Sequence, residues 1–182
     1  MKKAIGMIEI KTVSSGMRAA DRMVKTAEVE LLQADTVCPG KFIAIISGDL
    51  SAVKAAVESA ATAESEQLID TFVLGNPHES IFTALYGATE IGNPNALGVL
   101  ETFSAAAAVV AADIAAKTAL VDLIELRLAR GMCGKSYLLL TGEIAAVEAA
   151  IERAKQGAGE DGMFLDSAVI PRPDEKFWSK IL

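Results

Sequence analysis

The 182-residue sequence has few of the residues from which active sites are most often built. It contains one histidine, two cysteines, one tryptophan and two tyrosines. The lone His78 has no second imidazole with which to bind a metal, and a surface or helix-start position is the ordinary interpretation. We find no Ser-His-Asp set, Walker-type loop or dinucleotide fingerprint, and the single strand glycines Gly6 and Gly98 favour close packing over phosphate binding. The sequence therefore predicts a protein that is not an enzyme.

Positive charge and long apolar runs are also scarce. With 17 basic and 24 acidic residues the net charge is −7, which disfavours a nucleic acid as partner. The longest uncharged apolar stretch, residues 103–112, is about ten residues long and too short to span a bilayer. No export signal is recognisable, because Met1-Lys2-Lys3 leads directly into the first strand pattern. We expect a cytoplasmic protein without a membrane partner, whose cysteines are thiols or metal ligands and not a disulfide.

What the chain does have is an internal duplication. Residues 4–35 match residues 96–127, and the match continues through Gly40-Lys41 with Gly134-Lys135 to Pro77 with Pro173. Each copy has about 90 residues, so we predict two domains, 1–92 and 93–182. A unit of this size buries a modest share of its surface, which favours burial between halves or between subunits.

Each copy has the pattern strand-helix-strand-strand-helix-strand, the order of ferredoxin-like βαββαβ domains in the α/β (α+β) class. The expected strands are 4–10, 29–37, 42–47, 68–74, 97–103, 120–128, 136–141 and 163–170, and the expected helices are 14–27, 52–60, 105–118 and 144–156. A short helical segment at 77–85 and a linker at 86–94 join the copies. The Ala-rich helix 104–117 is either a core helix or one pressed against a neighbouring subunit.

The two copies differ most at one turn. Residues 36–40, Thr-Val-Cys-Pro-Gly, stand against the longer residues 128–134, Leu-Ala-Arg-Gly-Met-Cys-Gly. Because duplication preserves the scaffold, a divergent place is a candidate for a dedicated role. Cys38 is then either a chance thiol or a ligand. One cysteine cannot hold an iron–sulfur cluster, but three chains around an axis would bring together three thiols, enough for three irons of a [4Fe-4S] cube.

Five segments resemble bacterial microcompartment shell proteins. They are Ala-Ile-Gly-Met-Ile-Glu at 4–9, Asp21-x-Met23-x-Lys25, Cys38-Pro39-Gly40-Lys41-Phe42, Gly48-Asp49-x-x-Ala52-Val53 and Ile170-Pro171-Arg172-Pro173. The duplication makes the chain similar to the tandem-domain members of that family. The resemblance implies a homotrimer that forms a pseudohexagonal tile and packs edge to edge with other shell proteins of the microcompartment.

The resemblance also implies site residues. Cys38 of each chain would bind one [4Fe-4S] cluster per trimer at the three-fold axis, flanked by Val37, Pro39, Gly40 and Lys41. The matching turn of the second copy contains Met132, Cys133 and Gly134, and Cys133 is either a second thiol near the axis or a loop cysteine. Lys25, Lys117 and Arg172 would make contacts between tiles.

The resulting hypothesis is a structural shell protein whose cluster passes electrons across the shell, or is delivered to redox enzymes inside it. Two alternatives remain at this point. One is a shell tile with an open metabolite pore and no cluster, in which Cys38 only lines the pore. The other is a ferredoxin-like ligand-binding regulator, with its ligand between the duplicated domains. The duplicated Glu9 and Glu101 are expected to have a structural use, such as a hydrogen bond to neighbouring backbone.

Overall fold

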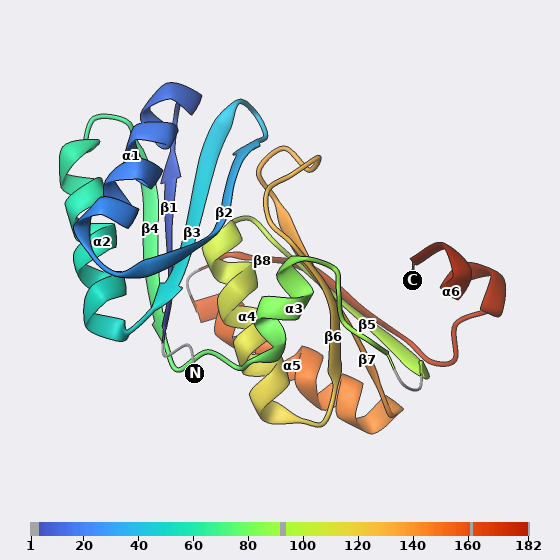
Figure 1. Cartoon of the computed structure of the whole chain (residues 1–182). Coiled ribbons are helices and arrows are strands. Elements are labelled where there is room, and N and C mark those ends of the chain that lie inside the picture. The colour runs from blue at the N-terminus through green and yellow to red at the C-terminus, as the bar shows by residue number, and fades with distance from the viewer. Residues whose placement is uncertain (1–3, 92–93, 161, 182) are drawn as a thin grey trace. The chain divides into compact units, whose positions relative to one another are not determined.

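The computed structural model of the chain describes residues 4–91, 94–160 and 162–181 (Figure 1). The chain divides into two compact units, Met1–Pro77 and His78–Leu182. The predicted boundary at 92/93 marks the start of the second repeat, and residues 92 and 93 lie outside the described residues. Residues 78–91 belong to the second unit because the helix within them packs on that unit.

The first unit is one βαββαβ repeat. Its elements are β1 (Ala4–Ile10), α1 (Val13–Thr26), β2 (Val29–Val37), β3 (Lys41–Gly48), α2 (Leu50–Ala63) and β4 (Leu68–Gly75). The strands form an antiparallel sheet in the order β2-β3-β1-β4. This order confirms the ferredoxin-like fold predicted from the element pattern. The central strand β1 is buried along its whole length, which explains why all of its residues except Glu9 are apolar.

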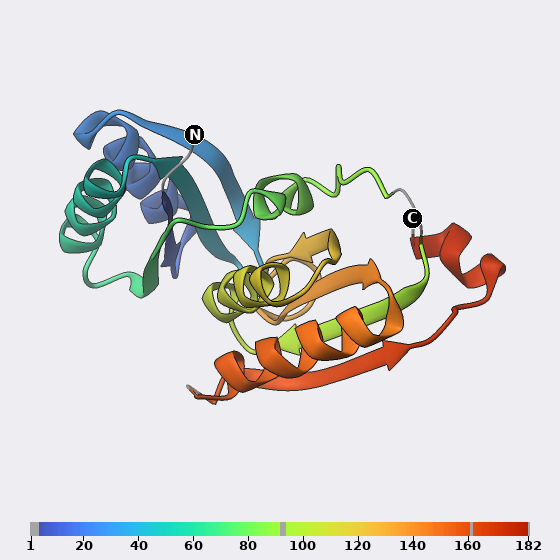
Figure 2. The ribbon, with the colours of Figure 1, turned by 90° about the horizontal axis from the view of Figure 1, so that it is seen from below.

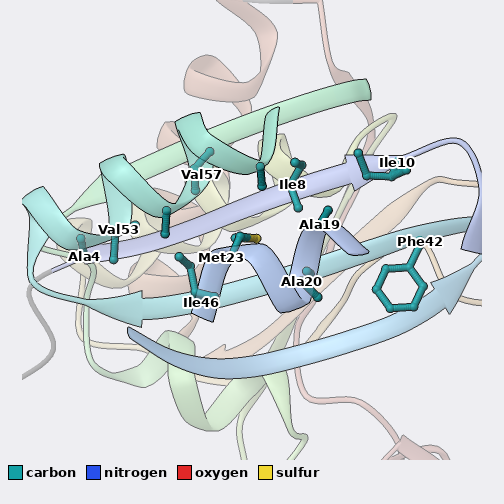
Figure 3. Close-up of a cluster of buried hydrophobic side chains, with 13 residues drawn as sticks. Ala4, Ile8, Ile10, Ala19, Ala20, Met23, Phe42, Ile46, Val53 and Val57 are labelled. Atoms are coloured by element: carbon teal, nitrogen blue, oxygen red, sulfur yellow. The ribbon is translucent and has the colours of Figure 1, made fainter. Parts of the chain in front are cut away.

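The core of the first unit lies between the sheet and its two helices (Figure 3). Met23 of α1 and Val53 of α2 are fully buried and belong to the same apolar cluster as Ile8 of β1. Gly6 brings α2 close to the sheet, because a Cβ at this position would lie 2.6 Å from Val53 Cγ1. The packing role expected for this glycine is confirmed, and Gly98 has the same role in the second unit, where a Cβ would lie 2.9 Å from Val147 Cγ1.

The second unit repeats the fold and adds a helix at each end. Its elements are α3 (Ser80–Leu85), β5 (Ala96–Thr102), α4 (Ala105–Thr118), β6 (Asp122–Arg127), β7 (Ser136–Gly142), α5 (Ile144–Glu160), β8 (Phe164–Ile170) and α6 (Glu175–Ile181). The sheet order is β6-β7-β5-β8, and α4 and α5 lie side by side on one face of it (Figure 2). Five alanines of α4 are buried, so the Ala-rich helix contributes to the core of its unit.

The helix α6 is missing from the sequence prediction. Its Trp178 is 9% exposed and packs against Leu97 and Ile124 of the second sheet. The duplication could have revealed it, since residues 175–181 stand where the predicted helix 77–85 stands in the first copy. In the described ranges, no helix is both long and apolar enough to cross a membrane.

Candidate functional site at the Cys38 turn

The turn between β2 and β3 is a short hairpin whose tip carries Cys38. Val37 pairs with Lys41 across the two strands, which leaves Cys38, Pro39 and Gly40 as the loop. The Gly40 amide donates to the Val37 carbonyl at 2.9 Å and closes the turn. Gly40 has a φ of +91°, a conformation that side chains other than glycine rarely adopt. The predicted hairpin is confirmed, and the backbone holds the cysteine at its tip.

Cys38 is a free thiol in a half-buried position. The preceding Val37 is 4% exposed and anchors the strand end, whereas Pro39 and Gly40 are exposed. In residues 4–91, 94–160 and 162–181, no group of three or more His, Cys, Asp or Glu side chains could hold a metal ion. A single chain therefore offers one thiolate at this turn. The donor set fits an iron–sulfur cluster only where several copies of the turn meet.

Lys41 at the base of the turn is committed to a partner inside the sheet. Its ammonium group forms an ion pair with the carboxylate of Glu9, whose side chain is 5% exposed. Glu9 lies on the central strand β1, opposite Ile43 of β3 and Asp70 of β4. Glu9 thus has a structural use, as predicted, but its partner is the side chain of Lys41, which joins β1 to the turn, and not the neighbouring backbone that was expected. A buried carboxylate needs such a partner, because burying an unpaired charge costs roughly several kcal/mol.

The corresponding turn of the second copy takes a different path. Ala129, Gly131, Cys133 and Gly134 all have positive φ values. The Lys135 amide donates to the Met132 carbonyl at 3.1 Å. Met132 is half-buried and Gly134 buried, while Cys133 is exposed. The extra residues form a wider loop, and Cys133 lies in a separate unit from Cys38.

The predicted edge residues lie at the ends of the units that are remote from these turns. In the first unit β1 ends at Ile10, opposite Phe42 and next to the hairpin, and α1 starts there. The 14 residues of α1 then rise by about 1.5 Å each, which places Lys25 roughly 20 Å away. Lys25 Nζ lies 2.6 Å from Asp21 Oδ2.

The second unit repeats this arrangement. Lys117 Nζ lies 2.7 Å from Asp113 Oδ2 in the last turn of α4. Arg172 is exposed and follows β8, whose Ile170 pairs with Leu97 at the start of β5. The end of β8 is therefore the end opposite to the β6–β7 turn. Each unit thus separates a turn at one end from basic side chains at the other.

The second unit also contains a cavity of about 460 Å³. It is lined by Gly87, Thr89, Ile91, Ile124, Glu125, Arg127 and Ile181. Arg127 lies 2.7 Å from Glu125 Oε1, and the Tyr137 hydroxyl donates to Glu125 Oε2 at 2.7 Å. The Arg127 guanidinium also lies 5.2 Å from the centre of the Tyr137 ring. The charged groups of the cavity wall therefore bind one another.

Burial, together with the hydrogen bond to Glu125, raises the pKa of Tyr137 to about 12. A raised pKa in the folded state contributes stability that is complete below the unfolded value of 10.0 and is lost as the pH rises towards 12. We expect a Tyr86→Phe chain, which retains Tyr137 alone, to show tyrosinate absorbance at 295 nm with a midpoint near 12. Glu125→Gln should lower this midpoint, and an unchanged midpoint would contradict the role assigned to Glu125.

Comparisons of the sequence and of the structure with known proteins agree on one family. The model of the BMC domain matches residues 4–77 and 96–173. The bacterial microcompartment shell protein PduT of Citrobacter freundii is 38% identical over 182 residues, covering 100% of this chain and 99% of that protein. The carboxysome shell protein CcmK2 of Thermosynechococcus vestitus is 34% identical over 85 residues, covering 44% of this chain and 83% of its own. The crystal structure of a microcompartment protein from Desulfitobacterium hafniense superposes with a TM-score of 0.94 at 42% identity, covering 98% of this chain and 99% of that one.

Proposed function

The chain belongs to the BMC-domain family of bacterial microcompartment shell proteins, and we propose that three copies of it form a pseudohexagonal tile with a [4Fe-4S] cluster at the centre. The family match supports a structural role in a shell. Two similar domains in one chain allow three chains to imitate a six-fold arrangement, in which six turns become two different sets of three. The trimer and the cluster go beyond the family match and are the substance of the proposal.

The observation that carries the proposal is the position of Cys38. It is a free thiol at a hairpin tip, at the end of its unit opposite to Lys25. If the Lys25 ends form the rim of the tile, the Cys38 turns meet at the centre. Three Cys38 thiolates would each bind one iron, which leaves one coordination position to a ligand from outside the three turns.

The chain's own residues would prepare such a site in two ways. The closed turn from Val37 to Gly40 holds the backbone of Cys38 at the hairpin tip, and Glu9 holds Lys41 in the ion pair at the base of the turn. An iron–sulfur cluster, when bound, supplies one-electron redox chemistry. At the centre of a shell tile, this chemistry suits electron transfer across the shell or delivery of the cluster to enzymes inside.

Iron and sulfide analysis of anaerobically purified protein tests the proposal. We expect a brown protein with about four irons per three chains, or roughly 1.3 irons per chain, as one cube per trimer requires. The molar mass from light scattering should be that of three chains. A colourless trimer without iron would reject the cluster and favour the tile with an open pore. A monomer would reject the trimeric tile; the ligand-binding regulator is already excluded by the family match.

Reversing the charge at the proposed rim should stop tiles from associating. Lys25 and its partner Asp21, one helical turn earlier, are both exposed, and such a pair contributes little to folding, whereas Asp113, the partner of Lys117, is only 8% exposed. We therefore expect Lys25→Asp alone to abolish two-dimensional arrays in negative-stain micrographs while the trimer remains. Lys54→Asp on the exposed surface of α2 is the matched control and should leave arrays intact. Arrays formed by Lys25→Asp would contradict the assignment of the rim.

A further inference from the structure

Because the two repeats are similar, the contact that α3 makes with the second repeat can be compared with the matching surface of the first. The His78 amide donates to Asp113 Oδ1 at 2.8 Å, and the Asp113 side chain is only 8% exposed. The helix α3 lies against α4 and β6, and its Ile81 and Ala84 are fully buried. The segment that follows the first repeat is therefore docked on the first helix and second strand of the second repeat.

The segment that follows the second repeat has the same local structure. Asn76 and Arg172 occupy matching positions with φ values of 52° and 48°, and each is followed by a proline. His78 Nδ1 accepts a hydrogen bond from the Ser80 amide at 3.3 Å, and Asp174 Oδ1 accepts one from the Lys176 amide at 2.9 Å. A short helix follows in both copies, α3 in the first and α6 in the second. By this correspondence, Phe177 of α6 stands where Ile81 stands in α3.

The first repeat carries the surface on which such a segment would dock. In the second repeat Val109 and Leu123 are fully buried, whereas the matching Met17 and Leu31 of the first repeat are 59% and 40% exposed. The carboxylate that matches Asp113 is Asp21, whose side chain is 58% exposed. The helix α6 has the complementary feature, because Phe177 is 45% exposed where Ile81 is fully buried.

We propose that α6 of one chain docks on the α1–β2 surface of a second copy of this chain, with Phe177 packed against Met17 and Leu31. Trp178 keeps α6 attached to its own sheet through Leu97 and Ile124, so that Phe177 is presented outward. The backbone amide of Asp174 would then donate to Asp21, as that of His78 does to Asp113.

The contact uses different patches on the two chains, so it is head-to-tail. Head-to-tail contacts form a closed ring when the rotations from each chain to the next add up to a full turn. Since each chain contributes two similar units, three chains give a ring of six units. This inference rests on the proposed trimer and names the surface that closes it. The same contact would then occur six times in the ring, three times within chains through α3 and three times between chains through α6.

Phe177→Asp tests the contact, with Met17→Asp on the opposite patch. Both side chains are exposed in the single chain, so neither change should disturb folding, which circular dichroism and the melting temperature will show. We expect each variant to raise the dissociation constant between subunits by roughly 30-fold or more, the effect of losing an interface hot spot. Leu120→Asp, at a side chain that is 94% exposed after α4, is the matched control and should remain trimeric.

Photo-cross-linking gives a second measurement on the intact chain. With p-benzoylphenylalanine in place of Phe177, we expect cross-links between chains to peptides containing Met17 or Leu31. A Phe177→Asp variant that is as trimeric as the wild type, or cross-links confined to other surfaces, would overturn the docking and leave the proposed tile standing. A wild-type chain that is itself monomeric would reject the tile and the docking together.

Discussion

Cys38→Ala is expected to give a colourless protein without iron or sulfide that still elutes as a trimer. The reason is the donor count: the Cys38 turn offers one thiolate per chain, and removal of this thiolate from each of three chains leaves the cluster without a cysteine ligand. Cys38 is half-buried at a hairpin tip, outside the strand pairing, so alanine should fold without difficulty. Iron, sulfide and visible absorbance after anaerobic purification measure the effect.

Cys133→Ala is the matched control for this experiment. Cys133 is also a free cysteine on a turn between two strands, but it belongs to the wider loop of the second copy. We expect this variant to retain its iron at the wild-type level. Iron retained by Cys38→Ala and lost by Cys133→Ala would move the metal site to the other turn. Iron retained by both variants would reject cysteine ligation of the cluster.

Gly16→Ala is expected to destabilise the first unit by about 2 kcal/mol. Alanine is favoured over glycine in a helix by up to about 1 kcal/mol, so an open site would gain stability. At this site, however, the new Cβ would lie 2.3 Å from Phe42 Cβ and 2.4 Å from Phe42 Cγ. Phe42 is 3% exposed, and its Cβ is fixed by the strand backbone, so α1 must move away from β3. Overpacking of this kind costs up to about 3 kcal/mol, which outweighs the helix term.

Urea unfolding followed by circular dichroism measures this loss. Gly159→Ala in α5 is the control, because a Cβ there would meet no atom within 4 Å, and this variant should be equal to or slightly more stable than the wild type. The second repeat has Ala108 where the first has Gly16, and Ser136 where the first has Phe42. The first copy thus combines a small helix residue with a large strand residue, and the second copy combines a larger helix residue with a smaller strand residue. Equal stability of Gly16→Ala and the wild type would show that α1 does not pack on Phe42 as described.

Much of the fold could be predicted from local features of the sequence. The apolar run from Ala4 to Ile10 and the helical period that follows gave the first elements, and the repeat gave them a second time. The hairpin at Pro39-Gly40 was predicted from its turn residues. The seven residues of α6 are too few for periodicity alone to identify, and its match with the helical segment 77–85 of the first copy was the signal that could have revealed it. The position of Cys38 at a tip was within reach of the sequence, but the ion pair of Lys41 with Glu9 was not.

The sequence by itself determined the element order, the duplication and the chemistry of the two turns, because periodicity, repetition and turn residues act over a few neighbouring positions. The tertiary structure decided which distant residues meet. Glu9 and Lys41 are brought together by the pairing of β1 with β3, and His78 with Asp113 by the packing of α3 on the second unit. Strand register and helix docking depend on the whole buried surface of a unit and not on spacing along the chain. For that reason only the structure could show that the surface covered by α3 in the second repeat has an exposed counterpart in the first.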